Sequence, residues 1–197
     1  MSDFSNAKSP LSRFAIPSTV LTDTVWWRHV LMFSNCHTTL HRPPEPQDIL
    51  FAVDATTSYG IGVVFGCHWE SWKLLPGWNS HGRDIGWGEM VAIELGLRLV
   101  TALGRHDAHF ILRSDNMGVI HALEGGRSRN LQQNRILQRI VILVCTHNVW
   151  LTTNYVRSID NPADPPSRGL APLTLLHLSE FSSPIIPFPL QGLITRS

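Results

Sequence analysis

Cysteine is scarce in this sequence of 197 residues. The three cysteines, Cys36, Cys67 and Cys145, are odd in number and far apart, whereas small disulfide-stabilised domains carry closely spaced, even sets. The pattern argues against a disulfide framework. We therefore expect a reduced, intracellular protein that is not secreted, in either the cytoplasm or the nucleus.

The sequence also lacks an excess of charge of one sign and long apolar runs. Sixteen Lys and Arg residues against fifteen Asp and Glu residues give a net charge of +1, which excludes a globally basic nucleic-acid coat and an acidic tail. No apolar run reaches the ~18–20 residues of a membrane span. The N-terminal residues lack the uninterrupted apolar stretch of a signal peptide. We expect no membrane partner.

Hydrophobic residues make up 43% of the chain, enough to form a buried core. A run rich in proline at 41–46 interrupts the sequence, and neither a helix nor a central strand tolerates such a run. The sequence therefore predicts three parts: a leader and connection-like helical segment (1–47), a folded domain (48–169) and an irregular tail rich in Pro, Leu and Ser (170–197).

The hydrophobic pattern predicts an alternation of strands and helices in the domain. Strands are expected at 49–54, 60–66, 69–78, 110–112 and 150–157, and helices at 21–35, 87–103, 117–124, 131–145 and from 161. This order predicts an α/β fold with a five-stranded mixed sheet flanked by helices, in which three antiparallel strands are followed by parallel ones.

Four carboxylates, those of Asp54, Glu89, Asp115 and Asp164, are expected at strand ends or helix starts. Such positions can converge on one edge of a sheet, where unpaired carboxylates would repel one another unless divalent cations lie among them. Oxygen ligands favour Mg²⁺ or Mn²⁺, and two such ions are the usual apparatus for hydrolysing a phosphodiester. The spacing alone is also compatible with ordinary strand ends, helix caps and solvated acids.

Four motifs around these acids resemble those of ribonuclease H domains, over about residues 48–169. They are Phe51-Ala52-Val53-Asp54-Ala55, Glu89-Met90-Val91-Ala92, Arg113-Ser114-Asp115-Asn116, and the closing Asn161-Pro162-Ala163-Asp164-Pro165-Pro166-Ser167-Arg168. Gly126–Asn130 (Gly-Arg-Ser-Arg-Asn) and the pair Trp26-Trp27 resemble the reverse transcriptase/ribonuclease H polyproteins of retrotransposons, particularly DIRS-like elements and their fungal relatives.

The resemblance implies that Asp54, Glu89, Asp115 and Asp164 hold two Mg²⁺ ions, with Mn²⁺ as a substitute. The implied reaction is cleavage of the RNA strand of an RNA–DNA hybrid, leaving a 5′-phosphate. No Tyr-x-Asp-Asp polymerase motif is present, so a reverse transcriptase encoded elsewhere is a candidate partner. The chain would then be a ribonuclease H fragment, or a decayed or domesticated copy of one.

The sequence departs from the resemblance at two points. Many ribonuclease H enzymes carry a histidine before the last acid, and residues 157–161 contain none. Pro165 also disfavours the α conformation at Asp164, which makes this acid the ligand most open to displacement. Glu94 is the competing acid on the helix, but it lies ~500° around the helix from Glu89 and points away from it.

Local charge supplies the candidate nucleic-acid contacts. Residues 98–168 carry nine arginines and five acids, a balance of +4. The candidates on the loop and helix after Asp115 are Asn116, Arg127, Arg129, Asn130 and Arg135. A solvated helix face accounts for these arginines equally well. Hybrid recognition would read groove width and 2′-hydroxyls rather than base sequence.

Other classes of function remain as alternatives. A catalytically silent domain that binds nucleic acid or a protein partner is the first of them, and an integrase or transposase ranks last because its final acid should be Glu. A zinc site at Cys36, His37 and His41 lacks a second Cys/His pair at finger spacing. Ser114 lacks a His or Lys partner at motif spacing, which argues against a nucleophilic hydrolase.

Overall fold

A computed structural model describes residues 15–32, 43–178 and 186–197. The chain divides into two units, residues 1–37 and 38–197, and each is described by itself. The first unit contains α1 (Ser18–Met32), in which the rings of Trp26 and Trp27 are in edge contact. The zinc alternative at Cys36, His37 and His41 lies outside the described residues.

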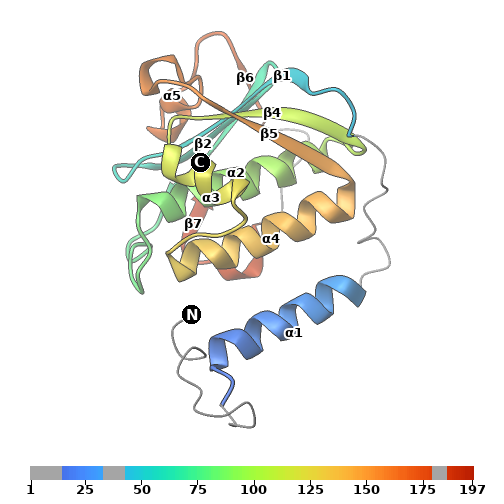
Figure 1. The fold of residues 1–197 in the computed structure, drawn as a ribbon. Helices are drawn as coiled ribbons and strands as arrows, with labels where there is room; N and C mark the ends of the chain where they lie inside the picture. The colour runs from blue at the N-terminus through green and yellow to red at the C-terminus, as the bar shows by residue number, and fades with distance from the viewer. Residues whose placement is uncertain (1–14, 33–42, 179–185) are drawn as a thin grey trace. The chain divides into compact units, whose positions relative to one another are not determined.

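The second unit is built on a mixed sheet (Figure 1). Its first five strands are β1 (Gln47–Ala55), β2 (Gly60–Phe65), β3 (His68–Leu74), β4 (Ala108–Ser114) and β5 (Val149–Tyr155). The spatial order is β5-β4-β1-β2-β3. The β1-β2 and β2-β3 pairs are antiparallel, whereas β4 is parallel to β1 and β5 is parallel to β4. The predicted α/β class with antiparallel strands followed by parallel ones is confirmed.

Helices cover both faces of this sheet, as Figure 1 shows. The helices α2 (Ile85–Ala102), α3 (Met117–Glu124) and α4 (Leu131–His147) lie on one side, and α5 (Asp164–Ser167) lies on the other, against β1, β2 and β3. A short 3₁₀ turn, η1 (Ser158–Asp160), precedes α5. The main core fills the space between the sheet and α2, because the apolar stripe predicted on this helix is buried.

Aromatic packing fixes the centre of the core. The rings of Phe51, Phe65 and Phe110 pack edge to face with centroids 5.7–6.4 Å apart, a favourable arrangement for aromatic pairs. Because these residues belong to β1, β2 and β4, their packing holds together β1 and β4, which lead to Asp54 and Asp115, and the neighbouring β2.

The C-terminal segment corrects the predicted strand number and the predicted irregular tail. β6 (Leu176–His177) pairs with the start of β3, and β7 (Ile194–Arg196) pairs with its end, so the sheet has seven strands rather than five. The 3₁₀ turn η2 (Phe188–Leu190) leads into β7. These strands are two and three residues long, too short for the alternation that identifies a strand in sequence. None of the described helices is long and apolar enough to cross a membrane.

Candidate metal centre

Three predicted acids meet where β1, β4 and α2 converge. Asp54 is the penultimate residue of β1, and Asp115 directly follows β4. These strands are parallel, with Ala52 aligned with Arg113, so their carboxyl ends reach the same edge of the sheet. Helix α2 begins beside them, and Glu89 is its fifth residue.

The start of α2 is set by a side-chain cap. The Asp84 carboxylate accepts a hydrogen bond from the backbone N–H of Trp87 at 2.8 Å, an interaction that fixes the first turn of a helix. Gly88 lets this turn approach β1, since a Cβ at Gly88 would lie 3.3 Å from the Cβ of Ala55. The cap therefore determines where Glu89 stands relative to Asp54.

The three carboxylates form a tight cluster. One oxygen of each of Asp54, Glu89 and Asp115 lies within 4.8 Å of the others. Asp54 and Glu89 are each only 4% exposed, and Asp115 is partly exposed. The cluster is thus open to solvent on the Asp115 side and closed behind the other two acids.

Glu89 has a buried oxygen that lacks a partner. Its Oε2 is shielded from solvent and accepts no hydrogen bond from the described residues. Burial, together with the charges of Asp54 and Asp115, raises the pKa of Glu89 well above its usual range. A buried carboxylate oxygen without a donor is costly. A divalent cation beside the three acids would both satisfy this oxygen and offset their repulsion, so the site fits Mg²⁺ or Mn²⁺ by charge and ligand type.

Asp54 is held by a residue from the far end of the domain. The hydroxyl of Ser167 donates a hydrogen bond to Asp54 Oδ2. Burial is the main cause that raises the pKa of Asp54, to about 6, with contributions from Asp115 and Asp164, while the Ser167 hydrogen bond opposes the rise. Ser167 stands in the closing motif that carries the resemblance, but nothing in the sequence indicates its contact with Asp54.

The rest of the closing motif packs directly on β1 and β2. Asn161 Nδ2 donates to the carbonyl of Val53 at 3.0 Å, and Ala163 is buried against Ala52. Gly62 of β2 lies beneath α5, where an added Cβ would be only 2.4 Å from the Ser167 nitrogen. This close approach brings Ser167 within reach of Asp54.

Asp164, the fourth predicted ligand, is not one of the three clustered acids. It is the first residue of α5, and its carboxylate is bound by the guanidinium of Arg168. Arg168 Nε lies 3.0 Å from Oδ1 and 2.9 Å from Oδ2, and Nη2 lies 2.7 Å from Oδ1. Asp164 is still near enough to raise the pKa of Asp54 through its charge.

Glu94, the competing acid, has a different environment. It is fully buried and forms ion pairs with Arg98 at 2.9 Å and Arg139 at 2.7 Å. The helical geometry that directs it away from Glu89 is confirmed, and its charge serves the contact between α2 and α4.

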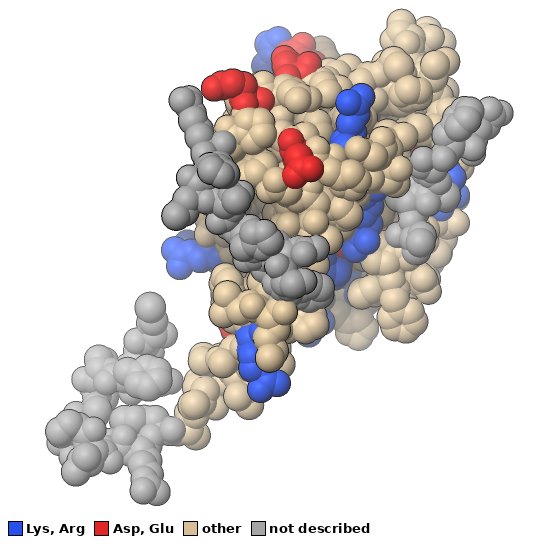
Figure 2. All heavy atoms as spheres, turned by 90° about the vertical axis from the view of Figure 1, so that its right-hand side faces the viewer, with Lys and Arg blue, Asp and Glu red and all other residues tan. Residues whose placement is uncertain are grey.

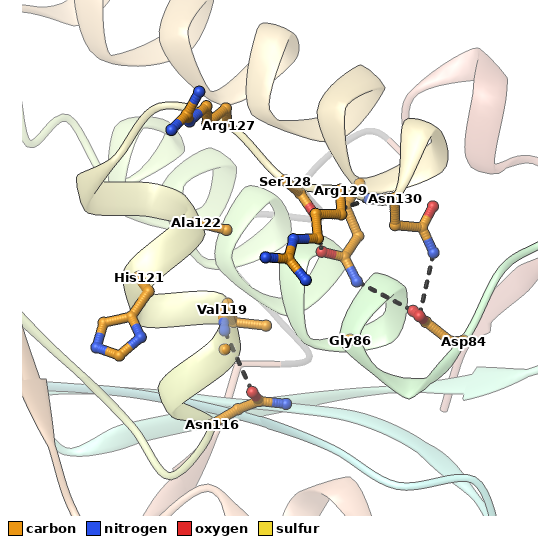
Figure 3. Close-up of a pocket in the computed structure, with 12 residues that line it drawn as sticks. Asp84, Gly86, Asn116, Val119, His121, Ala122, Arg127, Ser128, Arg129 and Asn130 are labelled. Atoms are coloured by element: carbon orange, nitrogen blue, oxygen red, sulfur yellow. Dashed lines mark hydrogen bonds between the residues drawn. The ribbon is translucent and has the colours of Figure 1, made fainter.

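Four of the five predicted nucleic-acid contacts surround one groove, shown in Figure 3. They are Asn116, Arg127, Arg129 and Asn130, and the groove has a volume of about 610 Å³. Both arginines are exposed, and neither forms an ion pair within the part of the chain that the structure describes. Arg135 does not line this groove; it is exposed on α4 beside Gln132.

The two asparagines also have structural roles. Asn116 caps α3 by accepting from Val119 N at 3.2 Å, and Asn130 caps α4 by accepting from Gln132 N at 2.8 Å. The Asn130 amide also donates to Asp84 Oδ2 at 3.1 Å. The caps therefore explain why asparagine stands at these positions without any nucleic acid.

Comparisons with known proteins assign no function to this site. No family model, curated protein or solved structure matches the chain.

Proposed function

We propose that this chain is a metal-dependent endonuclease of the ribonuclease H type, derived from a retroelement, that cuts the RNA strand of an RNA–DNA hybrid. The observation that carries the proposal is the cluster of Asp54, Glu89 and partly exposed Asp115, with an unpartnered buried oxygen on Glu89. Burying two acids beside a third without a counter-charge is costly, and such a cluster is expected where a cation is to be bound.

Each acid has a distinct part in the proposed site. Asp54 and Glu89 form the closed rear of the cluster, and Asp115 is the acid most accessible to a substrate. Ser167 orients Asp54 through its hydrogen bond. When bound, divalent ions supply activation of the attacking water and stabilisation of the leaving oxygen.

The arrangement of the sheet supports the proposal. The resemblance implies three antiparallel strands followed by parallel ones, and β1 to β5 have this arrangement. The acids also stand on the elements on which the motifs predict them.

Substrate binding is assigned to the groove lined by Arg127 and Arg129. Phosphate contacts from arginine set the position of a nucleic-acid strand, and these two side chains are free to make them. Charged side chains are otherwise sparse, as on the face shown in Figure 2, where uncharged residues cover most of the surface. A local pair of arginines is therefore a more plausible anchor than the field of the whole protein.

A catalytically silent, nucleic-acid-binding or scaffold domain is the second candidate. The ion pair between Asp164 and Arg168 favours it, because both oxygens of the fourth acid are already engaged. The absence of histidine from residues 157–161 points the same way.

Cleavage of a labelled RNA–DNA hybrid tests the proposal. We expect Mg²⁺-dependent cutting of the RNA strand alone, lost in Asp115→Asn because a ligand charge is removed. Asp160→Asn is the matched control, since Asp160 pairs with Arg157 on the surface. A folded wild-type protein that binds the hybrid without cutting it would identify the silent domain instead.

A further inference from the structure

The ion pair between Arg168 and Asp164 stands beside the three-acid cluster. Asp164 and Arg168 lie four residues apart in and just after α5, where one helical turn brings such side chains together. Arg168 donates to both carboxylate oxygens of Asp164. The positive charge of Arg168 thus lies against both oxygens and opposes the approach of a cation to this carboxylate.

The cluster also acts on Arg168. The hydrogen bonds and charge of Asp164 raise the pKa of Arg168, and the charges of Asp54 and Asp115 contribute in the same direction. The guanidinium is thus attracted to the same acids that would attract a cation. It supplies the positive charge nearest to Asp164 in the described part of the chain.

We propose that Arg168 acts as a latch on Asp164: its guanidinium pairs with the carboxylate and keeps a cation from it. The chain then binds one divalent cation at Asp54, Glu89 and Asp115 first. A second cation binds at Asp164 only after the Arg168 side chain moves away. This inference rests on the proposed function, because it concerns the loading of the same metal centre. The order follows from the charges: among the described residues no ion pair engages the three clustered acids, whereas the carboxylate of Asp164 is paired with Arg168.

Solvent exposure makes the latch reversible. The Arg168 side chain is 50% exposed and that of Asp164 is 26% exposed, and ion pairs at this exposure contribute little to stability. The first cation also neutralises part of the charge that attracts Arg168. Binding of the first ion therefore weakens the latch and prepares Asp164 for the second.

Mn²⁺ binding to the full chain tests this order, with free Mn²⁺ measured by electron paramagnetic resonance. We expect the wild type to bind one ion and then a second more weakly. Arg168→Ala should tighten the second ion about two- to fivefold and leave the first nearly unchanged. Arg168→Lys keeps the positive charge but loses the bidentate contact with Asp164, so it should have a smaller effect.

Arg157→Ala is the matched control, because it removes the guanidinium from another short-range surface pair, with Asp160; it should change neither ion. Adding Asp164→Asn to Arg168→Ala should abolish the gain. Equal binding curves for the wild type and Arg168→Ala, or the same gain in Arg157→Ala, would overturn the latch.

Failure of the latch and failure of the proposed function give different results. Cleavage by the wild type with unchanged Mn²⁺ binding in Arg168→Ala overturns the latch alone. A gain of the second ion in Arg168→Ala without cleavage of any hybrid supports the latch and overturns the endonuclease. If neither protein binds Mn²⁺ while both are folded, both inferences fail.

Discussion

At the residue scale, the burial of Asp54 favours its protonated form, which opposes the proposed binding of a metal ion. Its carboxylate is nearly inaccessible and faces Asp115 and Asp164, and these surroundings raise its pKa to about 6. Without a cation the folded state keeps the Asp54 proton up to about pH 6, whereas metal binding requires the carboxylate. Stability and cation affinity are therefore expected to respond to pH in opposite directions.

The free energy of unfolding of the metal-free protein should fall as the pH rises through the raised pKa of Asp54. The unfolded chain releases the Asp54 proton near pH 3.8, whereas the native state keeps it until about pH 6, so the native state binds more protons in between and stability falls with rising pH. Between pH 5 and 7.5 we expect the wild type to lose about 1 kcal/mol relative to Asp54→Asn. Urea unfolding in EDTA measures this difference, and a constant difference would contradict the assignment.

Ser167 should set the pH at which the metal binds. Its hydrogen bond lowers the pKa of Asp54, so Ser167→Ala should raise that pKa further and move the midpoint of Mn²⁺ binding to higher pH. Ser158→Ala is the control, because Ser158 is an exposed residue of η1. An unshifted midpoint in Ser167→Ala would show that the hydroxyl does not orient Asp54.

Glu94 connects two helices at the element scale. It is buried in α2 and is bound by Arg98 from the same helix and by Arg139 from α4. A buried charge of this kind is stable only with its partners in place. The three residues therefore fix the packing of α4 on α2, the helix that carries Glu89 in its second turn.

Removing the charge of Glu94 should destabilise the fold. We expect Glu94→Gln to lower the free energy of unfolding by about 2–3 kcal/mol, because Arg139 and Arg98 then lose their counter-charge. Asp160→Asn, which breaks an exposed pair, should cost less than about 0.5 kcal/mol. Chemical denaturation of both variants measures the contrast, and equal losses would refute the structural role of Glu94.

At the element scale, the positions of individual helices could be predicted from the sequence. The second helix, predicted at 87–103, occurs at 85–102, and the helix at 117–124 has the predicted bounds, because apolar spacing and caps such as Asn116 are local signals. The convergence of Asp54, Glu89 and Asp115 was predictable from strand order. The Ser167–Asp54 contact was not, since it depends on how closely α5 packs against Gly62. The ion pair between Asp164 and Arg168 was likewise not predicted, since it depends on side-chain conformations.

At the scale of the whole molecule, the C-terminal segment completes the sheet. β6 and β7 cover successive parts of the outer edge of β3, and an uncovered edge strand invites association with other chains. Arg196 of β7 and His177 of β6 both contact the buried carboxylate of Glu70. The C-terminal segment thus both covers the outer edge of β3 and supplies side-chain partners of the Glu70 carboxylate.

Shortening the chain after Leu178 should therefore damage the fold. The loss of β7 exposes part of β3 and removes Arg196 from Glu70, so we expect a lower melting temperature and concentration-dependent association. Thermal unfolding and light scattering measure these effects. Arg196→Gln keeps the strand, and it should reduce the melting temperature without causing association; association in both proteins would show that the edge is not the cause.

The hydrogen bond between Ser167 and Asp54 spans 113 residues of sequence. All three clustered acids have been synthesised once residue 115 is added, but the residue that orients Asp54 emerges only with the closing motif. During translation the three acids are therefore complete some fifty residues before Ser167, which orients Asp54, is added. A nascent chain that has not reached residue 167 therefore carries the three acids without the hydroxyl that binds Asp54.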